Sequence, residues 1–381
     1  MNILQVCSAR EIGGGERHLV DLSRSLAERG HTVYVALSPG SPLISELSFL
    51  PTHQILEVSL RNSLDLSSAM QLARFAREHS VDIIHSHVAR DYPLTAFASA
   101  RAGNIPYVLT RHVLFPLKRA HRLILSRASR VIAVSRAVAA ALHRQGIFDQ
   151  NKIVTIPNGI NIERFAEKAR YQTRALYPDK DVSKLIVGMV GHLAPIKGQQ
   201  DLIRAAAILA AERNDVDFVI AGEDKSHTGE HRAAIESLIA ELKLTKRIQL
   251  LGWIDDVREL LGSLDVFVSP SRAEPFGLVI VEAMASGVPV VATMSEGATE
   301  ITEDGVTGRL VPIKDPEALA IAIKELLADP SERKRFSVNA RNRVEQYSLE
   351  RMVDATEQVY LDVLKTTDGD PDHGISEHRE E

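Results

Sequence analysis

Two carboxylates bracket an almost wholly apolar stretch, AEPFGLVIVEAMA, in the last third of the chain. Glu274 precedes a Pro-Phe-Gly sequence, and Glu282 follows it within a run of apolar residues. Burying an unpaired carboxylate costs far more free energy than a methylene contact contributes, so we expect a polar ligand to meet both side chains. A capping or surface role is the alternative, and it fits Glu274 less well because Pro275 and Phe276 crowd it with apolar surface.

Backbone amides and one lysine near these carboxylates could hold an anion. Pro275 to Gly277 interrupt the chain after a strand that ends near Ser269, so a helix is expected to begin close to Gly277. The free amides of its first turn would present partial positive charge. Lys197 lies in another strand-to-helix loop, GHLAPIKG, where its ammonium could meet a phosphate; the alternative is a solvated lysine.

A third loop, Gly13-Gly14-Gly15-Glu16, precedes a helix in the first half of the chain. Glycines let the backbone approach a ligand closely, and the helix N-terminus behind them favours anions. A turn that needs positive φ would have the same sequence, so both interpretations stay open. The loop does not fit Gly-x-Gly-x-x-Gly, which leaves a nicotinamide dehydrogenase poorly supported.

Short apolar runs of strand length alternate with helical patterns along the chain, which predicts parallel, doubly wound sheets. We expect two Rossmann-like α/β domains in tandem, at residues 1–165 and 183–348, joined by the polar stretch 161–184 and facing a cleft that binds the ligand. The expected strands are residues 3–7, 32–37, 82–84, 107–109, 131–134 and 153–156 in the first domain, and 185–191, 218–221, 248–250, 266–269, 288–292 and 310–311 in the second.

Composition sets further bounds. With 381 residues, 45% hydrophobic and 25% charged, the chain suits a soluble globular protein of two domains. Its single cysteine, Cys7, provides neither a disulfide framework nor a cysteine-rich metal site, and we expect a buried thiol. The N-terminus has no signal-like pattern and no run approaches a membrane span, which predicts a cytoplasmic protein. Residues 366–381, acidic and poor in apolar side chains, are expected to be disordered.

The formal charge is unevenly distributed. Residues 1–165 hold 19 Lys and Arg against 12 Asp and Glu, and the remainder holds 26 against 38, so the two parts carry +7 and −12. This asymmetry indicates either an anionic partner for the first half or ordinary variation between domains. Nothing in the sequence predicts a nucleic-acid partner or an oligomeric state.

The segment EPFGLVIVEAMASGVPVVA, with its two glutamates eight positions apart, resembles the signature of the family 4 retaining glycosyltransferases. That family uses nucleotide-sugar donors and has the two-Rossmann GT-B architecture. The resemblance extends over residues 1 to about 365. It includes GGGERHLVDLSRSLAERGH (13–31), VDIIHSH (81–87), LTRH (109–112), IPNGIN (156–161), VGHLAPIKG (190–198), LGWIDDVRELLGSLDVFVSPS (251–271) and EDGVTGRLVP (303–312).

The resemblance implies which part of the nucleotide-sugar donor each matching residue would bind. Lys197 and the backbone around Phe276, Gly277 and Leu278 would hold the diphosphate. Glu282 would bind the nucleotide ribose.

For the transferred sugar, the resemblance implies Glu274 as a direct contact and His112 beside the sugar, where it would orient a hydroxyl or stabilise charge. Gly14 would come close to the phosphate or sugar from the first domain. A last helix at about residues 349–365 would cross back to that domain.

One position departs from the family pattern, because His192 stands where an arginine is usual. A permanent bidentate cation becomes a group whose unperturbed pKa lies near 6.5. Phosphate binding would then be weaker or pH dependent, or another basic residue would substitute. Loss of activity is the less favoured hypothesis, since Glu274, Lys197 and His112 are intact.

The resemblance thus implies transfer of a sugar, from a UDP- or GDP-sugar, to a hydroxyl of a glycan or lipid-linked acceptor in bacterial-type glycan, lipopolysaccharide or glycolipid synthesis. We favour front-face attack over a double displacement, for which no second carboxylate can be assigned. Two alternatives from other classes are a non-catalytic nucleotide-sugar-binding protein and a sugar-nucleotide epimerase of the same fold.

No essential metal is expected. Asp215-Val216-Asp217 spells an Asp-x-Asp sequence but leads directly into a strand, so a loop entering that strand is favoured over a metal site. His85 and His87 alternate at a strand end and could suggest zinc, but no third ligand is evident near them in the sequence. A packing or acceptor-side role is therefore predicted for both.

Residues 111–130 mix arginines and a lysine with leucines and Phe115. A basic amphipathic segment can rest on anionic lipid, which would place the protein at the inner face of the cytoplasmic membrane and suit a lipid-linked acceptor. A core helix with a basic solvent face is the alternative.

Overall fold

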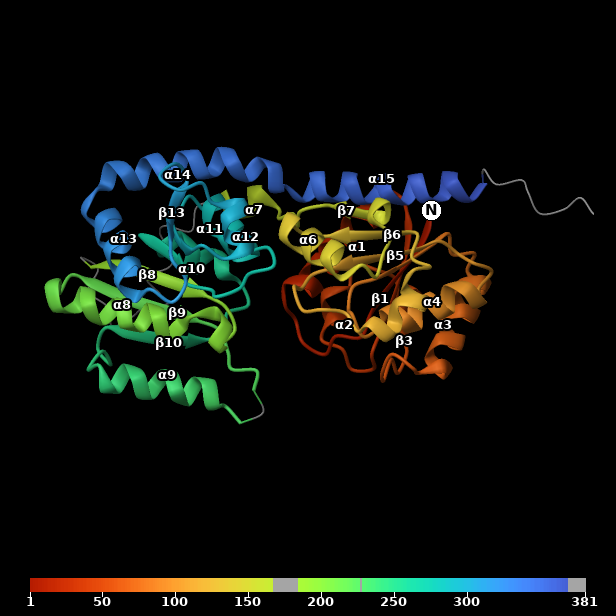
Figure 1. The fold of residues 1–381 in the computed structure, drawn as a ribbon, viewed down its shortest axis with the longest axis horizontal. Coiled ribbons are helices and arrows are strands. Elements are labelled where there is room, and N and C mark those ends of the chain that lie inside the picture. The colour runs from red at the N-terminus through yellow and green to blue at the C-terminus, as the bar shows by residue number, and fades with distance from the viewer. Residues whose placement is uncertain (167–183, 227, 369–381) are drawn as a thin grey trace, which may run out of the picture. The chain divides into compact units, whose positions relative to one another are not determined.

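The computed structural model describes residues 1–166, 184–226 and 228–368, and these form two compact units (Figure 1). Unit 1 comprises residues 1–156 together with the chain from Met352 onward. Unit 2 comprises Pro157–Arg351. Each unit is built around one parallel sheet, as the alternation of strands and helices predicts.

The sheet of unit 1 has the strand order β3-β2-β1-β4-β5-β6-β7, and every neighbouring pair is parallel. Because parallel strands need crossover connections, helices follow the strands and cover the sheet. The strands are β1 (Asn2–Cys7), β2 (Thr32–Leu37), β3 (Ile55–Glu57), β4 (Ile83–Ser86), β5 (Tyr107–Arg111), β6 (Arg130–Ala133) and β7 (Ile153–Thr155).

The helices of unit 1 begin and end at recognisable signals. Asp65 accepts a hydrogen bond from the Ser68 amide and Ser135 from the Val138 amide, so both act as N-caps. The helices are α1 (Gly14–Glu28), α2 (Leu43–Glu46), α3 (Leu66–Glu78), α4 (Tyr92–Arg101), α5 (Arg122–Leu125) and α6 (Arg136–Gln145), with 3₁₀ helices η1 (Thr52–Gln54), η2 (Arg119–His121) and η3 (Gln150–Lys152).

The sheet of unit 2 has the order β10-β9-β8-β11-β12-β13 and is also parallel throughout. Its central strands are buried on both faces, which explains their continuous apolar sequences. The strands are β8 (Leu185–Val190), β9 (Val216–Ala221), β10 (Ile248–Gly252), β11 (Val266–Ser269), β12 (Val290–Thr293) and β13 (Gly308–Val311).

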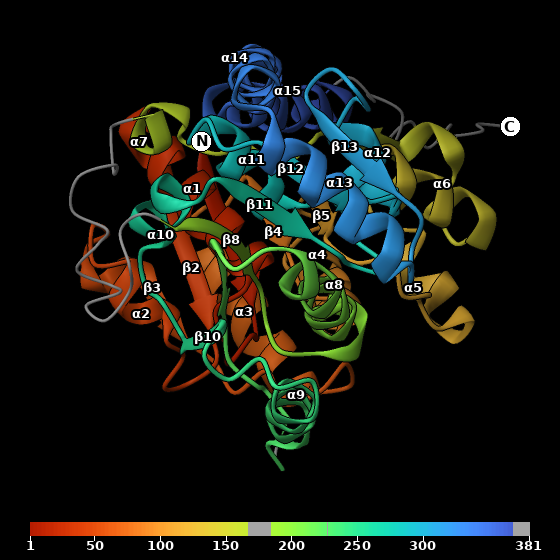
Figure 2. The ribbon, with the colours of Figure 1, turned by 90° about the vertical axis from the view of Figure 1, so that its left-hand side faces the viewer.

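Two helices of unit 2, α8 and α13, pack side by side and bury an apolar cluster against the sheet (Figure 1 and Figure 2). The helices of this unit are α7 (Ile162–Ala166), α8 (Gln199–Glu212), α9 (Glu230–Glu241), α10 (Val257–Ser263), α11 (Leu278–Ala285), α12 (Glu296–Ile301), α13 (Pro316–Ala328) and α14 (Pro330–Val344), with 3₁₀ helices η5 (Pro195–Lys197) and η6 (Glu345–Tyr347).

The last helix, α15 (Leu349–Asp368), is longer than expected and belongs to unit 1 from Met352 onward. Tyr360 is fully buried there, and its hydroxyl contacts His85 of β4. The predicted disordered tail therefore begins within a helix, and its remainder, residues 369–381, lies outside the described residues. Most of the predicted connection, residues 167–183, lies outside them as well.

The predicted strands are confirmed to within a few residues, with one omission. The short strand β3 was missed because its three residues are half-buried or exposed and offer no apolar run. Cys7 is fully buried, as expected, and burial raises the pKa of its thiol. No helix in the described ranges is long and apolar enough to span a bilayer.

Residues 111–130 do not form one amphipathic helix. After β5 ends at Arg111, the chain runs through a loop into η2 and the four-residue α5. Phe115 and Leu123 are exposed, with 68% and 88% of their surfaces open to solvent. The expected core helix with a basic solvent face is therefore wrong for this segment.

Candidate active site

In unit 2 the expected donor-site residues follow β8 and β11, two adjacent strands at the centre of the sheet. The chain turns from β8 toward β9 on one side, whereas β11 continues toward β12 on the other. In such sheets the loops after the strands diverge at this switch point and leave a place for a ligand. The loop after β8 carries Lys197, and the loop after β11 carries Glu274.

Lys197 and Glu274 meet as an ion pair. The Lys197 Nζ atom donates a hydrogen bond to Oε2 of Glu274 at 2.7 Å. The side chains are 27% and 13% exposed, so the pair is neither fully buried nor at the open surface. The structure thus brings together two predicted site residues that lie far apart in the sequence.

Close backbone approach makes this pairing possible. The Arg272 amide donates to the Ile196 carbonyl at 2.7 Å, which ties the two loops together. Gly198 lies beside this contact at φ +73°, and a Cβ atom built there would come within 2.0 Å of the Pro270 carbonyl oxygen. Only glycine tolerates both the left-handed backbone and the contact.

A second glycine positions Glu274 from the other side. The Gly297 amide donates to the Glu274 carbonyl at 2.7 Å, and a Cβ atom on Gly297 would fall 2.1 Å from the Phe276 carbonyl oxygen. Glu296 accepts a longer hydrogen bond, 3.4 Å, from the Glu274 amide. The loop that bears Glu274 is therefore held between α12 and the Lys197 loop.

Helix α11 begins just after this loop, as the glycine predicts. Gly277 precedes it at φ +107°, and no side chain in the described part of the chain caps its N-terminus. Its first-turn amides therefore keep their capacity to bind an anion. Glu282 lies in the second turn and is only 6% exposed, and Leu278 is half-buried.

Phe276 does not present its ring to a ligand. The side chain is 3% exposed and its ring packs edge-on against Tyr347, with ring centroids 5.6 Å apart. Any contact that this residue makes with a donor would come from its backbone. The aromatic side chain serves the packing of unit 2 instead.

His192 lies directly after β8 with its ring stacked on Trp253. The ring centroids are 6.2 Å apart and the planes are inclined by 19°. Its carbonyl accepts a hydrogen bond from the Gln199 side chain at 2.7 Å, which fixes the backbone. The Lys225 Nζ atom lies 5.2 Å from the centre of the Trp253 ring, so a permanent cation is close to the same indole.

The two carboxylates of the Asp-x-Asp sequence have partners of their own. Asp215 accepts two hydrogen bonds from Arg213, and Asp217 lies inside β9 with Arg247 at 3.3 Å and Lys184 at 3.5 Å. These ion pairs give both aspartates a structural role.

In unit 1 the corresponding switch point lies between β1 and β4. The Glu16 side chain reaches back to accept a hydrogen bond from the Gly13 amide at 3.0 Å, so the glycine loop is partly capped by the chain itself. A Cβ atom on Gly15 would lie 3.2 Å from the His112 ring, so this glycine gives the imidazole its room. None of Gly13, Gly14 and Gly15 has a positive φ, so the hypothesis of a turn that needs positive φ is wrong, and the close approach at Gly15 is to the His112 ring.

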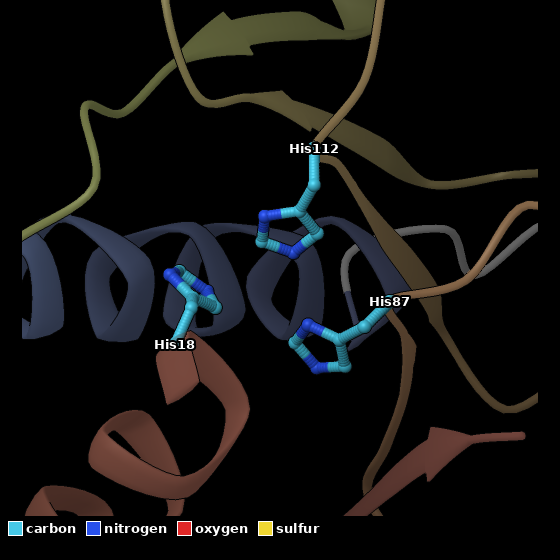
Figure 3. Close-up of side chains that lie close together, drawn as sticks. All are labelled: His18, His87 and His112. Atoms are coloured by element: carbon cyan, nitrogen blue, oxygen red, sulfur yellow. The ribbon is translucent and has the colours of Figure 1, made fainter. Parts of the chain in front are cut away.

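Three histidines gather at this end of the sheet (Figure 3). His18 comes from α1, His87 follows β4 and His112 follows β5. One nitrogen of each lies within 4.8 Å of the others. The pair that the sequence suggested, His85 with His87, is thus not the one that the structure groups. The partners of His87 are His18 and His112, whereas His85 points elsewhere.

His85 and His87 belong to a buried hydrogen-bond network. His85 contacts Tyr360 at 2.6 Å and Thr110 at 2.7 Å, and His87 Nε2 contacts Gln5 Oε1 at 2.7 Å. Burial lowers the pKa values of His85, His87 and His112 well below the usual 6.5, because an imidazolium would lose its hydration there. All three rings are neutral at pH 7.

Comparison with known proteins identifies the family. The profile described as Glycosyltransferase Family 4 matches residues 12–164, and that of the Glycosyl transferases group 1 matches residues 178–343. A lipopolysaccharide core biosynthesis glycosyltransferase, LpsE of Rhizobium meliloti (strain 1021), is 30% identical over 360 residues, covering 92% of this chain and 96% of LpsE. The chain belongs to the family 4 glycosyltransferases.

Other relatives agree with this assignment. The N-acetyl-alpha-D-glucosaminyl L-malate synthase of Bacillus anthracis is 28% identical over 373 residues, with 93% of this chain and 95% of that protein covered. HepE of Anabaena, solved in complex with UDP and glucose, superposes with a TM-score of 0.82 at 25% identity and covers 94% of this chain and 98% of HepE. The protein is a nucleotide-sugar-dependent glycosyltransferase with two Rossmann-like GT-B domains.

The glycine contact behind Lys197 of this glycosyltransferase can be tested by substitution. Gly198→Ala adds a Cβ atom where Pro270 leaves no room, whereas Gly229→Ala places the same atom at a helix start with φ +68° and open space around it. We expect the control to lose about 1 kcal/mol of unfolding free energy from the left-handed backbone. Gly198→Ala should lose about 1–3 kcal/mol more from the clash.

Urea unfolding of both variants measures the difference. Weaker binding of a nucleoside diphosphate to Gly198→Ala, with Gly229→Ala unaffected, would accompany a displaced Lys197. Equal stability of the two variants would show that the loops are not in tight contact at Gly198.

Proposed function

We propose that this glycosyltransferase transfers its sugar with retention, and that Lys197, Glu274 and the start of α11 form the centre at which the sugar leaves its diphosphate. The observation that carries the proposal is the ion pair between Lys197 and Glu274 beside the uncapped N-terminus of α11. A carboxylate suits sugar hydroxyls, while an ammonium and free amides suit phosphate. The two chemistries of a nucleotide sugar are thus matched by neighbouring groups.

Donor binding would change the partners of Lys197. With the diphosphate present, the ammonium is shared between a phosphate oxygen and Glu274, and the carboxylate gains acceptor capacity for sugar hydroxyls. Backbone amides at Gly277 and Leu278 would meet the same phosphates, and buried Glu282 would accept from the ribose.

In the transfer step, the bond between the anomeric carbon and the phosphate oxygen breaks as the acceptor oxygen bonds to the same face of the sugar. The departing diphosphate takes the acceptor proton, so the charge and the proton are balanced. Lys197 and the α11 amides stabilise the negative charge that grows on the leaving oxygen. Glu274 is held by Lys197, which favours sugar binding over the nucleophile of a double displacement.

His112 of unit 1 is proposed to orient a sugar hydroxyl. The resemblance left open whether it orients a hydroxyl or stabilises charge. Burial lowers its pKa well below 6.5, so the ring is neutral and offers one donor and one acceptor. A neutral ring supports the first role. Gly14, the exposed first residue of α1, stays proposed as a backbone contact.

The donor base and the acceptor are proposed from relatives. HepE holds UDP and glucose, which supports a UDP-sugar before a GDP-sugar. LpsE acts in lipopolysaccharide core biosynthesis, which supports a glycan or lipid-linked hydroxyl as acceptor. We propose that transfer needs no metal, because Lys197 and the helix amides supply the positive charge that a metal would otherwise bring to the diphosphate.

Removing the two charges separately distinguishes their roles. Glu274→Ala should reduce transfer about 100-fold or more, because it removes a contact to the reacting sugar. The same change frees Lys197, so UDP should bind equally well or more tightly. Lys197→Ala should weaken UDP binding about 10-fold to 100-fold through loss of a charged hydrogen bond.

Isothermal calorimetry with UDP and a transfer assay measure these effects, each with and without a chelator. Lys324→Ala is a matched control, because Lys324 pairs with an exposed glutamate on the outer helices. Near-normal turnover of Glu274→Ala would remove that residue from the site. Unchanged UDP affinity of Lys197→Ala would do the same for the lysine.

His192→Arg tests the departure from the family. An arginine can stack on Trp253 as the imidazole does and adds a permanent charge beside the Lys197 loop. We expect UDP binding to be equal or tighter. Isothermal calorimetry checks this, and clearly weaker binding would show that the pocket requires the smaller ring.

Peripheral membrane contact through residues 111–130 is part of the same proposal. Phe115 and Leu123 are exposed among Lys118, Arg119 and Arg122, a combination that suits anionic lipid. Sedimentation with vesicles containing phosphatidylglycerol should recover the protein, and Phe115→Ser with Leu123→Ser should release it. Equal recovery with neutral vesicles, or none with either, would exclude the contact.

A further inference from the structure

The histidine cluster of unit 1 has the composition of a metal site. His18, His87 and His112 come from three different elements, and one nitrogen from each lies within 4.8 Å of the other two. His18 and His87 are buried, and His112 is half-buried. Figure 3 shows the three rings drawn around a common point between α1 and the loops after β4 and β5.

His87 supplies an independent sign that something binds at this point. Gln5 offers Oε1 to His87 Nε2 at 2.7 Å, while the Gln5 amide nitrogen faces the Tyr360 hydroxyl. His87 Nε2 must therefore carry the proton, and Nδ1 keeps its lone pair. Within the described ranges no protein group donates to this Nδ1 atom, although the residue is only 4% exposed.

An orphaned lone pair in such a place is costly. A buried acceptor without a partner loses about 1–3 kcal/mol of hydration that nothing replaces. Both ring nitrogens of His112 are likewise buried without a hydrogen bond from the described residues. A ligand that accepts electron pairs from these nitrogens would recover that cost.

We propose that His18, His87 and His112 form a binding site for a borderline divalent cation, with Zn²⁺ as the reference ion. Three imidazoles leave one position open for water in a tetrahedral zinc site. With bonds of about 2.0–2.1 Å, the nitrogens of such a site lie about 3.4 Å apart, so the rings close in by small side-chain rotations. Mg²⁺ is not expected to bind, because it prefers oxygen ligands.

The surroundings supply the support that a histidine ligand needs. Metal-bound histidines usually donate their other N–H to an oxygen acceptor, which fixes the tautomer. Gln5 does this for His87, and Gln5 is fully buried between β2 and β4 in the centre of the sheet. Tyr360 links Gln5 to His85, so the acceptor is itself held in place.

Metal binding would have a consequence for transfer, and this second step rests on the proposed function. The cation would take the lone pair of His112, the residue proposed to orient a sugar hydroxyl. One imidazole nitrogen cannot hold a metal and accept a hydrogen bond at once. The site would therefore bind the cation in competition with the sugar, and zinc would inhibit transfer.

Zinc binding to the chelator-stripped full chain is the first test. Equilibrium dialysis with metal analysis should give one tightly held Zn²⁺ per chain. His18→Ala and His87→Ala should each lose it or weaken it at least 10-fold, in line with the loss of a ligand. His143→Ala is the matched control, because this histidine is exposed on α6 in the same unit and should retain the ion.

Two further readouts separate ligation from misfolding. Co²⁺ should give the intense visible absorption of a tetrahedral site in the parent chain and in His143→Ala, but not in folded His18→Ala. Gln5→Leu keeps the volume but removes the acceptor, and should weaken Zn²⁺ binding while the thermal unfolding transition stays cooperative. Circular dichroism establishes which variants are folded.

The proposal fails if the stripped parent chain takes up no zinc, or if folded His18→Ala and His87→Ala bind as much zinc as the parent and His143→Ala do. It also fails if Co²⁺ gives only the weak absorption of an octahedral ion. These binding results need no nucleotide sugar, so they are independent of the transferase mechanism. Zinc that binds to the cluster without inhibiting transfer would leave the metal site intact and remove His112 from sugar binding.

Discussion

The parallel pairing of β1 with β4, and of β8 with β11, governs where chemistry can take place in this protein. Parallel strands all end at the same edge of their sheet, so the loops that follow them emerge together. The sheet order reverses between these strands, so the chain leaves them toward opposite sides of the sheet, and in unit 2 a hydrogen bond from the Arg272 amide to the Ile196 carbonyl still ties the two loops together. Lys197 meets Glu274, and His87 meets His112, because parallel strands bring the loops that carry them to one edge of each sheet.

The two units use this edge in opposite ways. Unit 2 places a partly buried ion pair and uncapped amides there, so its electrostatics suit a diphosphate. Unit 1 places neutral, buried imidazoles there, and each of them offers one directed lone pair and one N–H donor. The Glu16 carboxylate beside them accepts a hydrogen bond from the Gly13 amide at the start of α1. Burial explains this difference between the units. It disfavours a charged imidazole in unit 1 more strongly than it disfavours the partly exposed ion pair of Lys197 and Glu274 in unit 2.

The sequence predicts the strands and the donor-site loops well, because apolar runs and glycines report local structure directly. Lys197 and Glu274 were found by their motifs, but their contact depends on Gly198 and Gly297, whose role is visible only when the neighbouring carbonyls are in place. The burial of the Phe276 ring against Tyr347 was not predictable, because an aromatic side chain in a glycine loop has the same sequence whether it faces a ligand or packs inside the unit. His18 was overlooked because its place beside His87 depends on how α1 leaves β1, and no periodicity in the sequence reports that angle.

The network around Gln5 makes these histidines more than packing residues. A core that needed only volume at His87 would be served by an apolar side chain, which leaves no acceptor unpaired. Instead, Gln5 fixes the proton of His87 on Nε2, away from the cluster. The Gln5 amide in turn donates a hydrogen bond to the Tyr360 hydroxyl of α15. The orphaned lone pair is then a property of the folded chain that either a cation or a hydroxyl hydrogen can satisfy. The cation and the sugar hydroxyl would compete at His112. Of the three histidines in the cluster, only His112 is also among the residues proposed to contact the sugar.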